Sequence, residues 1–380
     1  MSEKKEVSRR SFIQATAAGA STLALGISQR VLGANDEVIL GMIGTGGRGQ
    51  SLLKRLTRVP HVRVAALCDL REERVNQAGQ IFEDAKKYIQ FEELLEKEKL
   101  DGCIVATEVG NHAKCVIPVL ESGLHCFSEK PMDCTVEKVD AIVKAARQAK
   151  GIYQVGFQRR YAPAFVDGIG QIHAGIIGDV TIMQGHWHWP WQVGGWVADV
   201  DMSGGEIVEQ ACHHMDVMSW VKQGKPPVKC VAVGHITRPN PGSNEHNSED
   251  QSAVTFLWDD GTIFSYTHMF YLADHFQSEQ LVVHGKKGGV DLREGMFYPR
   301  EGQGEAKRIA EKVPDWEYGT LEELIAFADH IRKGEKSRSN QETGRVSTLM
   351  SLMARKAMYE RETKTFDPKV VTWEDLGSTT

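Results

Sequence analysis

Residues 37–49 read EVILGMIGTGGRG, and this stretch decides the first fold prediction. Its opening residues are mostly apolar and rich in Val and Ile, which is typical of a buried parallel strand. Gly44, Gly46 and Gly49 follow at once as G-x-G-x-x-G and open a helical pattern. Such glycines permit a tight turn, a close approach of backbone to a pyrophosphate, and packing of helix on strand. The stretch therefore predicts a dinucleotide-binding turn made of Gly44, Thr45, Gly46, Gly47, Arg48 and Gly49.

An acidic residue ends the next apolar run, VRVAALCD. At this place in a dinucleotide-binding fold, a carboxylate binds the ribose hydroxyls of the adenosine. Asp69 therefore favours NAD over NADP, because a 2′-phosphate would meet a carboxylate, although Arg71 keeps NADP open. The alternative is a structural glycine turn with a capping aspartate, which the surrounding strand–helix alternation disfavours.

The pattern of apolar runs divides the chain into two halves. From residue 37 to 157, strands alternate with helical segments, which predicts an α/β Rossmann domain with a doubly wound parallel sheet over 35–157. A helix is expected there over 71–87. After residue 158 the strands are joined by short turns and end in two amphipathic helices. This predicts a C-terminal α+β domain with an open, mostly antiparallel sheet over 158–380.

The first 34 residues have the layout of a signal peptide: a charged start, a weakly apolar stretch and the sequence VLGAND. Arg9 and Arg10, followed by SFI, resemble a twin-arginine (Tat) signal, which exports folded proteins. We therefore expect 1–34 to be removed and the mature protein to be periplasmic or otherwise exported by the Tat machinery. The apolar part is too short to span a membrane, so the mature form is expected outside the membrane. The alternative is an ordinary amphipathic N-terminal helix.

The net charge of −6 disfavours nucleic acid and anionic membranes as partners, because both require a basic face. The histidines show no H-x-x-x-H or HExxH spacing, so no metal site is predicted.

Three further motifs carry a resemblance. Glu129-Lys130-Pro131 ends a predicted strand, GFQRRYAPAF spans 156–165, and GGEIVEQACHHMD spans 204–216. Together with the glycine turn and in this order, they resemble the Gfo/Idh/MocA oxidoreductases over nearly all of residues 37–366. The resemblance places Lys130 near the nicotinamide and the reacting hydroxyl, where its charge would stabilise a developing alkoxide. It also implies cofactor contacts for Thr107, Asn111, His112, Glu129 and Lys130, and a substrate-proximal Arg159; Arg160 is as well explained by a surface salt bridge.

The segment 205–221 is predicted as one helix. Glu209 and His213 would be i and i+4, and His213 and Asp216 i and i+3, so the three would share one face. A histidine oriented by a carboxylate suits a general base for an alcohol proton, taken by His213 or by Lys130. The resemblance aligns His213 with the family's histidine and Glu209 with its usual Asp, so that Glu209 would orient His213 or bind a substrate hydroxyl. His214 is expected to be structural, and the alternative for the helix is a buried, hydrogen-bonded histidine.

The stretch HWHWPWQVGGW over 186–196 is unusually aromatic. His186 and Trp187 are predicted to line a sugar site, with the tryptophans as stacking walls and the histidines as hydroxyl partners. The alternative is a strand with an aromatic face in the core or at an oligomer interface.

These features predict an NAD-dependent oxidoreductase that acts on a secondary hydroxyl of a sugar, sugar derivative or glycoside. Free NAD is a cytoplasmic cofactor. We therefore expect an exported enzyme to bind its NAD before export and not to release it. The main alternative is a redox-neutral, NAD-dependent glycoside hydrolase or lyase that oxidises, eliminates and reduces again. A non-catalytic sugar-binding protein is disfavoured because Lys130, Glu209 and His213 are all present. A homo-oligomer formed through the C-terminal sheet is also expected.

Overall fold

The computed structural model describes residues 36–191, 194–236, 248–270, 272–359 and 370–378. The predicted signal peptide, 1–34, lies outside these ranges. No helix within them is both long and apolar enough to cross a membrane.

The first half of the chain forms a six-stranded sheet whose paired strands all run parallel. The strand order is β3-β2-β1-β4-β5-β6, which places the glycine turn after β1 at the point where the order reverses. The strands are β1 Val38–Ile43, β2 Val62–Cys68, β3 Lys86–Tyr88, β4 Gly102–Val105, β5 His125–Glu129 and β6 Tyr153–Gly156. The helices are α1 Gly47–Leu56, α2 Glu72–Ala78, α3 Phe91–Lys97, α4 His112–Glu121 and α5 Val136–Gln148. The predicted doubly wound sheet is confirmed.

One predicted element of this half is wrong. The helix expected over 71–87 ends at Ala78, the chain turns after Gly79, and β3 begins within the predicted helical stretch. Pairing of β3 with the edge of β2 satisfies backbone groups that a longer helix would have satisfied internally.

The second half forms a nine-stranded sheet in the order β14-β13-β12-β11-β7-β10-β9-β8-β15. Its pairs are antiparallel except for β7 with β10, so the predicted mostly antiparallel sheet is confirmed. The strands are β7 Val180–His188, β8 Lys229–His235, β9 Gln251–Leu257, β10 Ile263–Met269, β11 Ser278–Gly285, β12 Gly288–Asp291, β13 Met296–Pro299, β14 Lys307–Arg308 and β15 Val370–Thr372.

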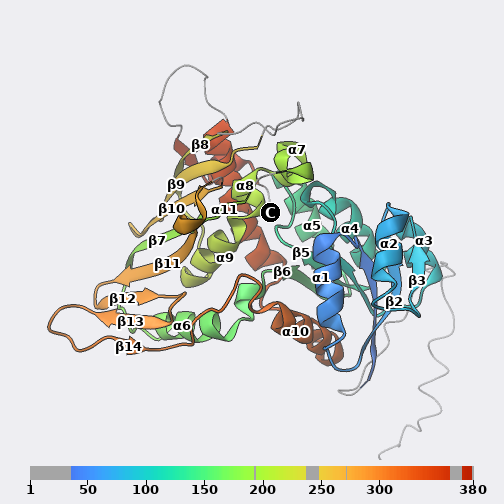
Figure 1. Ribbon diagram of the computed structural model, residues 1–380. Helices are drawn as coiled ribbons and strands as arrows, with labels where there is room; N and C mark the ends of the chain where they lie inside the picture. Colours follow the sequence, from blue (N-terminus) through green and yellow to red (C-terminus); the bar gives the residue numbers. More distant parts are fainter. Residues whose placement is uncertain (1–35, 192–193, 237–247, 271, 360–369, 379–380) are drawn as a thin grey trace, which may run out of the picture.

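Helices from the second half hold the two sheets together. The helix α11, Gln341–Tyr359, runs between the sheets and contacts α5, β6 and β8, as Figure 1 shows in red. The helices α6, Pro163–His173, and α9, Cys212–Val221, bury apolar side chains against the nine-stranded sheet. The helix α10, Thr320–Lys333, instead packs on the parallel sheet, where Leu324 and Phe327 join the core of β1 and α1. Part of the first sheet's core is therefore supplied by a segment far along the chain.

The third glycine of the turn can be tested by adding one methyl group. A Cβ at position 49 would lie 2.2 Å from the Gly44 carbonyl oxygen, a backbone atom that cannot move aside without shifting the turn. We expect Gly49→Ala to lower the unfolding free energy by about 1–3 kcal/mol and to weaken dinucleotide binding. Gly47→Ala is the matched control, because its Cβ would meet nothing within 4 Å. Thermal unfolding measures the stability of the two variants, and equal stability would contradict this account of the turn.

Candidate active site

The glycine turn is shaped so that only glycine fits at its crowded positions. Gly44 has φ +90° and packs against Ala106, whose carbonyl oxygen would lie 2.5 Å from a Cβ. Gly46, Gly47 and Arg48 then line a pocket of 420 Å³ together with Asp69, Thr107 and Asn111. The turn therefore leaves its backbone open to the pocket, as close approach of a pyrophosphate requires.

Asp69 lies in this pocket and bonds to the backbone on two sides. Its Oδ2 accepts the Thr45 N–H at 2.8 Å and its Oδ1 accepts the Arg71 N–H at 3.0 Å, so it holds the glycine turn in place. A carboxylate has lone pairs left over for ribose hydroxyls after two such bonds. Arg71 and Arg74 line the same pocket, and Arg74 was missed from the sequence although it stands one helical turn after Arg71. The donor set and the open turn fit a dinucleotide.

Two residues predicted to touch the cofactor lie behind the pocket wall. His112 is buried, with Nδ1 2.8 Å from the Pro131 carbonyl oxygen and Nε2 3.2 Å from that of Thr107. Thr45 is fully buried and faces Asp69 rather than the pocket. Both residues position the loops that carry Thr107 and the glycines.

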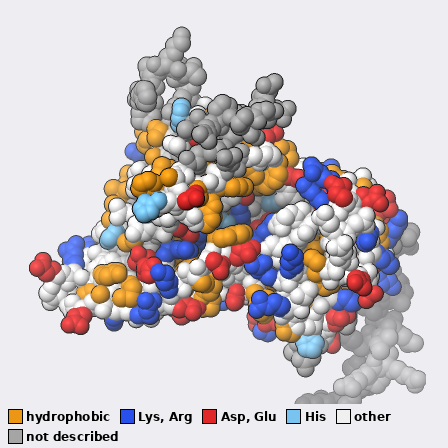
Figure 2. Space-filling view, viewed as in Figure 1, with side chains coloured by type: hydrophobic (Ala, Val, Ile, Leu, Met, Phe, Trp, Pro, Cys, Tyr) orange, Lys and Arg blue, Asp and Glu red, His pale blue; other side chains and the backbone are white. Residues whose placement is uncertain are grey.

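Arg48 links the turn to the second half of the chain. Its Nε donates to Glu129 at 2.6 Å, and its other nitrogens lie 3.5 Å from Glu317 and 3.6 Å from Glu323. Figure 2 shows acidic and basic side chains meeting between the two halves on this face. Glu129, which the resemblance places at the cofactor, is thus buried as the partner of Arg48. The Lys130–Pro131 peptide bond that follows is cis.

Lys130 and Glu209 meet at the boundary between the two sheets. The Lys130 Nζ donates to the Glu209 carboxylate Oε1 at 2.9 Å and to the Glu209 carbonyl oxygen at 2.5 Å. Burial lowers the pKa of Lys130, but the attraction of the Glu209 carboxylate raises it by more. The pKa of Lys130 therefore lies above its usual value. Lys130 is therefore a charged hydrogen-bond donor held in place by Glu209. The second oxygen of Glu209, Oε2, has no partner among the described residues.

The predicted continuous helix over 205–221 is wrong. The chain forms one turn, α8, Glu206–Glu209, and then begins again as α9, because the N–H groups of Gln210 and Ala211 both bond to the Glu206 carbonyl. The break changes the register, so Glu209 turns to Lys130 rather than lying one turn from His213 on one face. The sequence spacing could not show this extra residue in the turn.

The predicted pairing of His213 with Asp216 is also wrong. Asp216 is buried and binds Arg160 at 2.8 Å and the Ser347 hydroxyl at 2.6 Å. Arg160 is correspondingly buried rather than at the surface. Burial and the positive charge of Lys130 hold the pKa of His213 well below its usual value, so His213 is neutral. Its Nδ1 has no partner within the described part of the chain.

Trp187 lies against His213, with ring centroids 5.9 Å apart. The indole also stacks on His268 and lies beneath the Arg159 guanidinium, so protein groups cover it and it offers no open face for sugar stacking. Its Nε1 has no partner in the described ranges and is the group available to a ligand hydroxyl. His186 is next to Trp187 on β7 and therefore points to the other face of the sheet, where it stacks on His188 at 4.5 Å. His186 and Trp187 therefore cannot both contact one sugar, as predicted, and the buried Trp187 agrees with the alternative of an aromatic core face.

A buried carboxylate on β11 was missed. Glu279 binds Arg159 at 2.5 Å and Arg293 at 3.1 Å, and His214 Nε2 lies 3.2 Å away. Arg159 is thus held by Glu279, and His214 belongs to the same cluster, in keeping with its predicted structural role. The signal was present in the strand alternation, because Glu279 shares the inward face with the apolar Leu281 and Val283.

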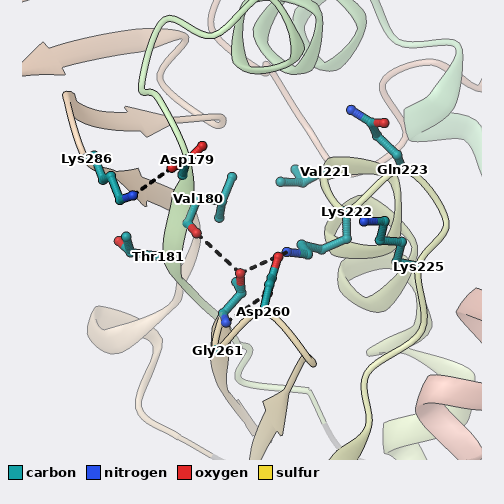
Figure 3. A pocket seen from close by; sticks show the side chains of 11 residues that line it. Asp179, Val180, Thr181, Val221, Lys222, Gln223, Lys225, Asp260, Gly261 and Lys286 are labelled. Atoms are coloured by element: carbon teal, nitrogen blue, oxygen red, sulfur yellow. Dashed lines mark hydrogen bonds and ion pairs between the residues drawn. The ribbon is translucent and has the colours of Figure 1, made fainter.

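Figure 3 shows a second cleft, between the start of β7, the turn from β9 to β10 and the end of α9, lined by Asp179, Lys222, Asp260 and Lys286 among others. Lys222 binds Asp260 at 2.6 Å, and Lys286 binds Asp179 at 2.7 Å, so these charges neutralise one another. No predicted site residue lines this cleft. Within the described ranges, no cluster of three His, Cys, Asp or Glu side chains could hold a metal ion.

Two family models match the chain. Residues 38–157 match an oxidoreductase family with an NAD-binding Rossmann fold, and residues 170–291 match the GFO/IDH/MocA C-terminal domain.

Among curated proteins, the chain is similar to a myo-inositol 2-dehydrogenase of Thermotoga maritima, with 22% identity over 85% of this chain and 96% of the relative. It is also similar to an inositol 2-dehydrogenase/D-chiro-inositol 3-dehydrogenase of Lacticaseibacillus casei, with 27% identity over 67% of this chain and 72% of the relative.

Two solved structures share the fold. The scyllo-inositol dehydrogenase of Lactobacillus casei with bound NAD(H) and scyllo-inositol superposes with a TM-score of 0.75 at 20% identity, over 89% of this chain and 100% of that one. A levoglucosan dehydrogenase in complex with NADH has a TM-score of 0.75 at 16% identity, over 84% and 96% of the two chains.

The role of Asp216 can be separated from catalysis. Asp216→Asn removes the charge that a buried Arg160 requires, and we expect a loss of about 3–5 kcal/mol of unfolding free energy, measured by urea denaturation. Arg160→Gln is the partner variant, and the double variant should cost less than the sum of the single ones. A variant of unchanged stability with a shifted pH–rate profile would instead restore the orienting role for His213.

Proposed function

Because the chain belongs to the Gfo/Idh/MocA oxidoreductase family, we propose that it oxidises a secondary hydroxyl of a sugar, sugar derivative or glycoside with NAD. The observation that carries this proposal is the buried Lys130–Glu209 pair, set beside the neutral His213. When bound, NAD accepts the hydride from the carbon that bears the hydroxyl.

The two candidate proton acceptors of the sequence analysis differ in charge. Lys130 is protonated and anchored by Glu209, so it suits a donor that polarises the substrate oxygen and stabilises negative charge there. His213 is neutral and so has a free lone pair to take the hydroxyl proton. We assign proton acceptance to His213 and electrostatic stabilisation to Lys130.

A polyhydroxylated substrate is supported by the polar atoms around this pair. Glu209 Oε2, His213 Nδ1 and Trp187 Nε1 are buried without a partner in the described ranges. Buried polar groups normally have hydrogen-bond partners, and these three atoms can accept from or donate to the hydroxyls of such a substrate. Two inositol dehydrogenases and a levoglucosan dehydrogenase among the relatives are in keeping with this class.

The proposal includes export by the Tat machinery and a cofactor that stays bound throughout turnover. The twin-arginine pattern of residues 9–10 supports export.

A homo-oligomer through the second sheet is proposed as well, because its face opposite α9 exposes the apolar side chains Val233 and Ile263. Measuring the molecular mass in solution tests the oligomeric state, and a monomer at micromolar concentration would contradict the proposed homo-oligomer.

The identity of the bound cofactor is tested by releasing it from the protein. The protein, purified without added nucleotide, is denatured and the supernatant analysed by mass spectrometry. We expect NAD in close to equal molar amount with the protein. NADP in its place would contradict the role given to Asp69, and no dinucleotide would contradict the proposal of a bound cofactor.

The same preparation identifies the reaction. Keto-sugars and cyclic ketones are added while the absorbance of bound NADH is followed, and bleaching is the expected result. Cleavage of a chromogenic glycoside, with loss of the proton next to the oxidised carbon to deuterated solvent, would instead indicate the redox-neutral hydrolase or lyase.

The Lys130 role is tested by substitution. We expect Lys130→Ala to lower kcat by at least about a hundredfold while dinucleotide binding persists, because the ammonium acts on the reacting oxygen. Lys144→Ala, on the exposed face of α5, is the control and should keep full activity. Undiminished turnover in Lys130→Ala would remove Lys130 from the mechanism.

A further inference from the structure

The wall of the cofactor pocket is not made by the first half of the chain alone. All its lining residues come from positions 43–115 except Trp196 and Met202, which belong to the second half. We propose that the segment 194–204 closes this pocket over the dinucleotide, and that Trp196 and Met202 retain the cofactor by covering it. This inference rests on the proposed use of NAD and supplies a physical reason why the cofactor would not dissociate.

The segment is built from two short helices, η3, Gly195–Ala198, and α7, Val200–Ser203. The Asp199 side chain caps α7 by accepting the Asp201 N–H at 3.0 Å. Gly204 and Gly205, both with positive φ, then turn the chain sharply into α8. The segment thus has a fixed shape of its own.

One side of the segment is anchored to the second half. Val197 and Ala198 are buried in a small apolar cluster with Phe270, and the Ala198 carbonyl accepts the Ser248 N–H at 3.2 Å. Trp196 packs against this cluster as well, and both Trp196 and Met202 are half-buried and line the pocket.

The other side rests on the first half. A Cβ at Gly110 would lie 3.1 Å from the Asp201 carbonyl oxygen and 3.2 Å from that of Met202, so the two backbones are in close contact. The Cys134 thiol also donates to the Asp201 carbonyl at 3.3 Å. Gly110 stands in η1, Val109–Asn111, next to the pocket-lining Asn111. The segment therefore spans from the second sheet to the rim of the cofactor pocket.

This arrangement has a kinetic consequence. A ligand enclosed by two parts of a chain leaves only when one part moves, and the release rate then depends on the contacts that hold the cover in place. An indole and a thioether are large apolar groups that exclude water from the pocket and pack on a planar ligand. Loss of the indole should open the pocket without removing any group that binds the phosphates or ribose.

The test measures cofactor release from the full chain. The protein is loaded with NADH, tryptophan is excited, and the transferred NADH emission is followed after a chase with excess NAD. We expect Trp196→Ala to release NADH about ten- to a hundredfold faster than the unaltered protein, with Met202→Ala and Trp196→Phe in between.

Trp316→Ala is the matched control. Trp316 is 46% exposed, does not line the pocket and is not part of the apolar cluster that anchors the segment. The rate of NADH release from this control variant should stay within about twofold of the rate for the unaltered protein. Thermal unfolding identifies a variant that fails to fold, in which case Trp196→Phe and Met202→Ala decide the question.

Release that is no faster in the folded Trp196 and Met202 variants would overturn the inference. Failure of the unaltered protein to bind NADH is a different result, because it would contradict the proposed cofactor itself.

Discussion

The ion pair between Lys130 and Glu209 depends on both halves of the chain at once. Lys130 follows the fifth strand of the parallel sheet, and Glu209 ends the single helical turn that precedes α9. Each side chain is only 11% exposed, so neither could stay charged there without the other. The proposed active site therefore exists only when the two halves are packed together, and the helix α11 between the sheets maintains that packing.

Burial raises the pKa of two further carboxyl groups, Glu206 and Glu249. Glu206 is fully buried with no partner for either oxygen in the described ranges, and burial beside Glu209 raises its pKa well above the usual value. Glu249 is buried too, with a raised pKa, although it accepts the Ile207 N–H at 2.8 Å and the Tyr359 hydroxyl. Burial therefore disfavours the charged form of both of these further acids. The site keeps its charge on Lys130 and Glu209.

The amino-acid sequence alone predicted the turn after β1, Asp69 and both sheet types, because these depend on local patterns such as glycine spacing and apolar alternation. It also singled out Lys130, Glu209 and His213. It was wrong about their hydrogen-bond partners, since the break at Gln210 and Ala211 between α8 and α9 is invisible to a spacing argument. Partners such as Glu279 for Arg159 and Ser347 for Asp216 lie more than a hundred residues apart and are fixed by tertiary packing alone.

The helix α10 bears on how the chain acquires its fold. Leu324, Phe327, Ala328 and Ile331 complete the core beneath the first sheet, although some 170 residues separate them from its last strand. A ribosome produces the six parallel strands long before it produces these side chains. The nucleotide-binding half must therefore wait with an exposed apolar face until nearly the whole polypeptide has been made. Cutting the chain between its two sheets would not yield two independent proteins, because the first would lack part of its own interior.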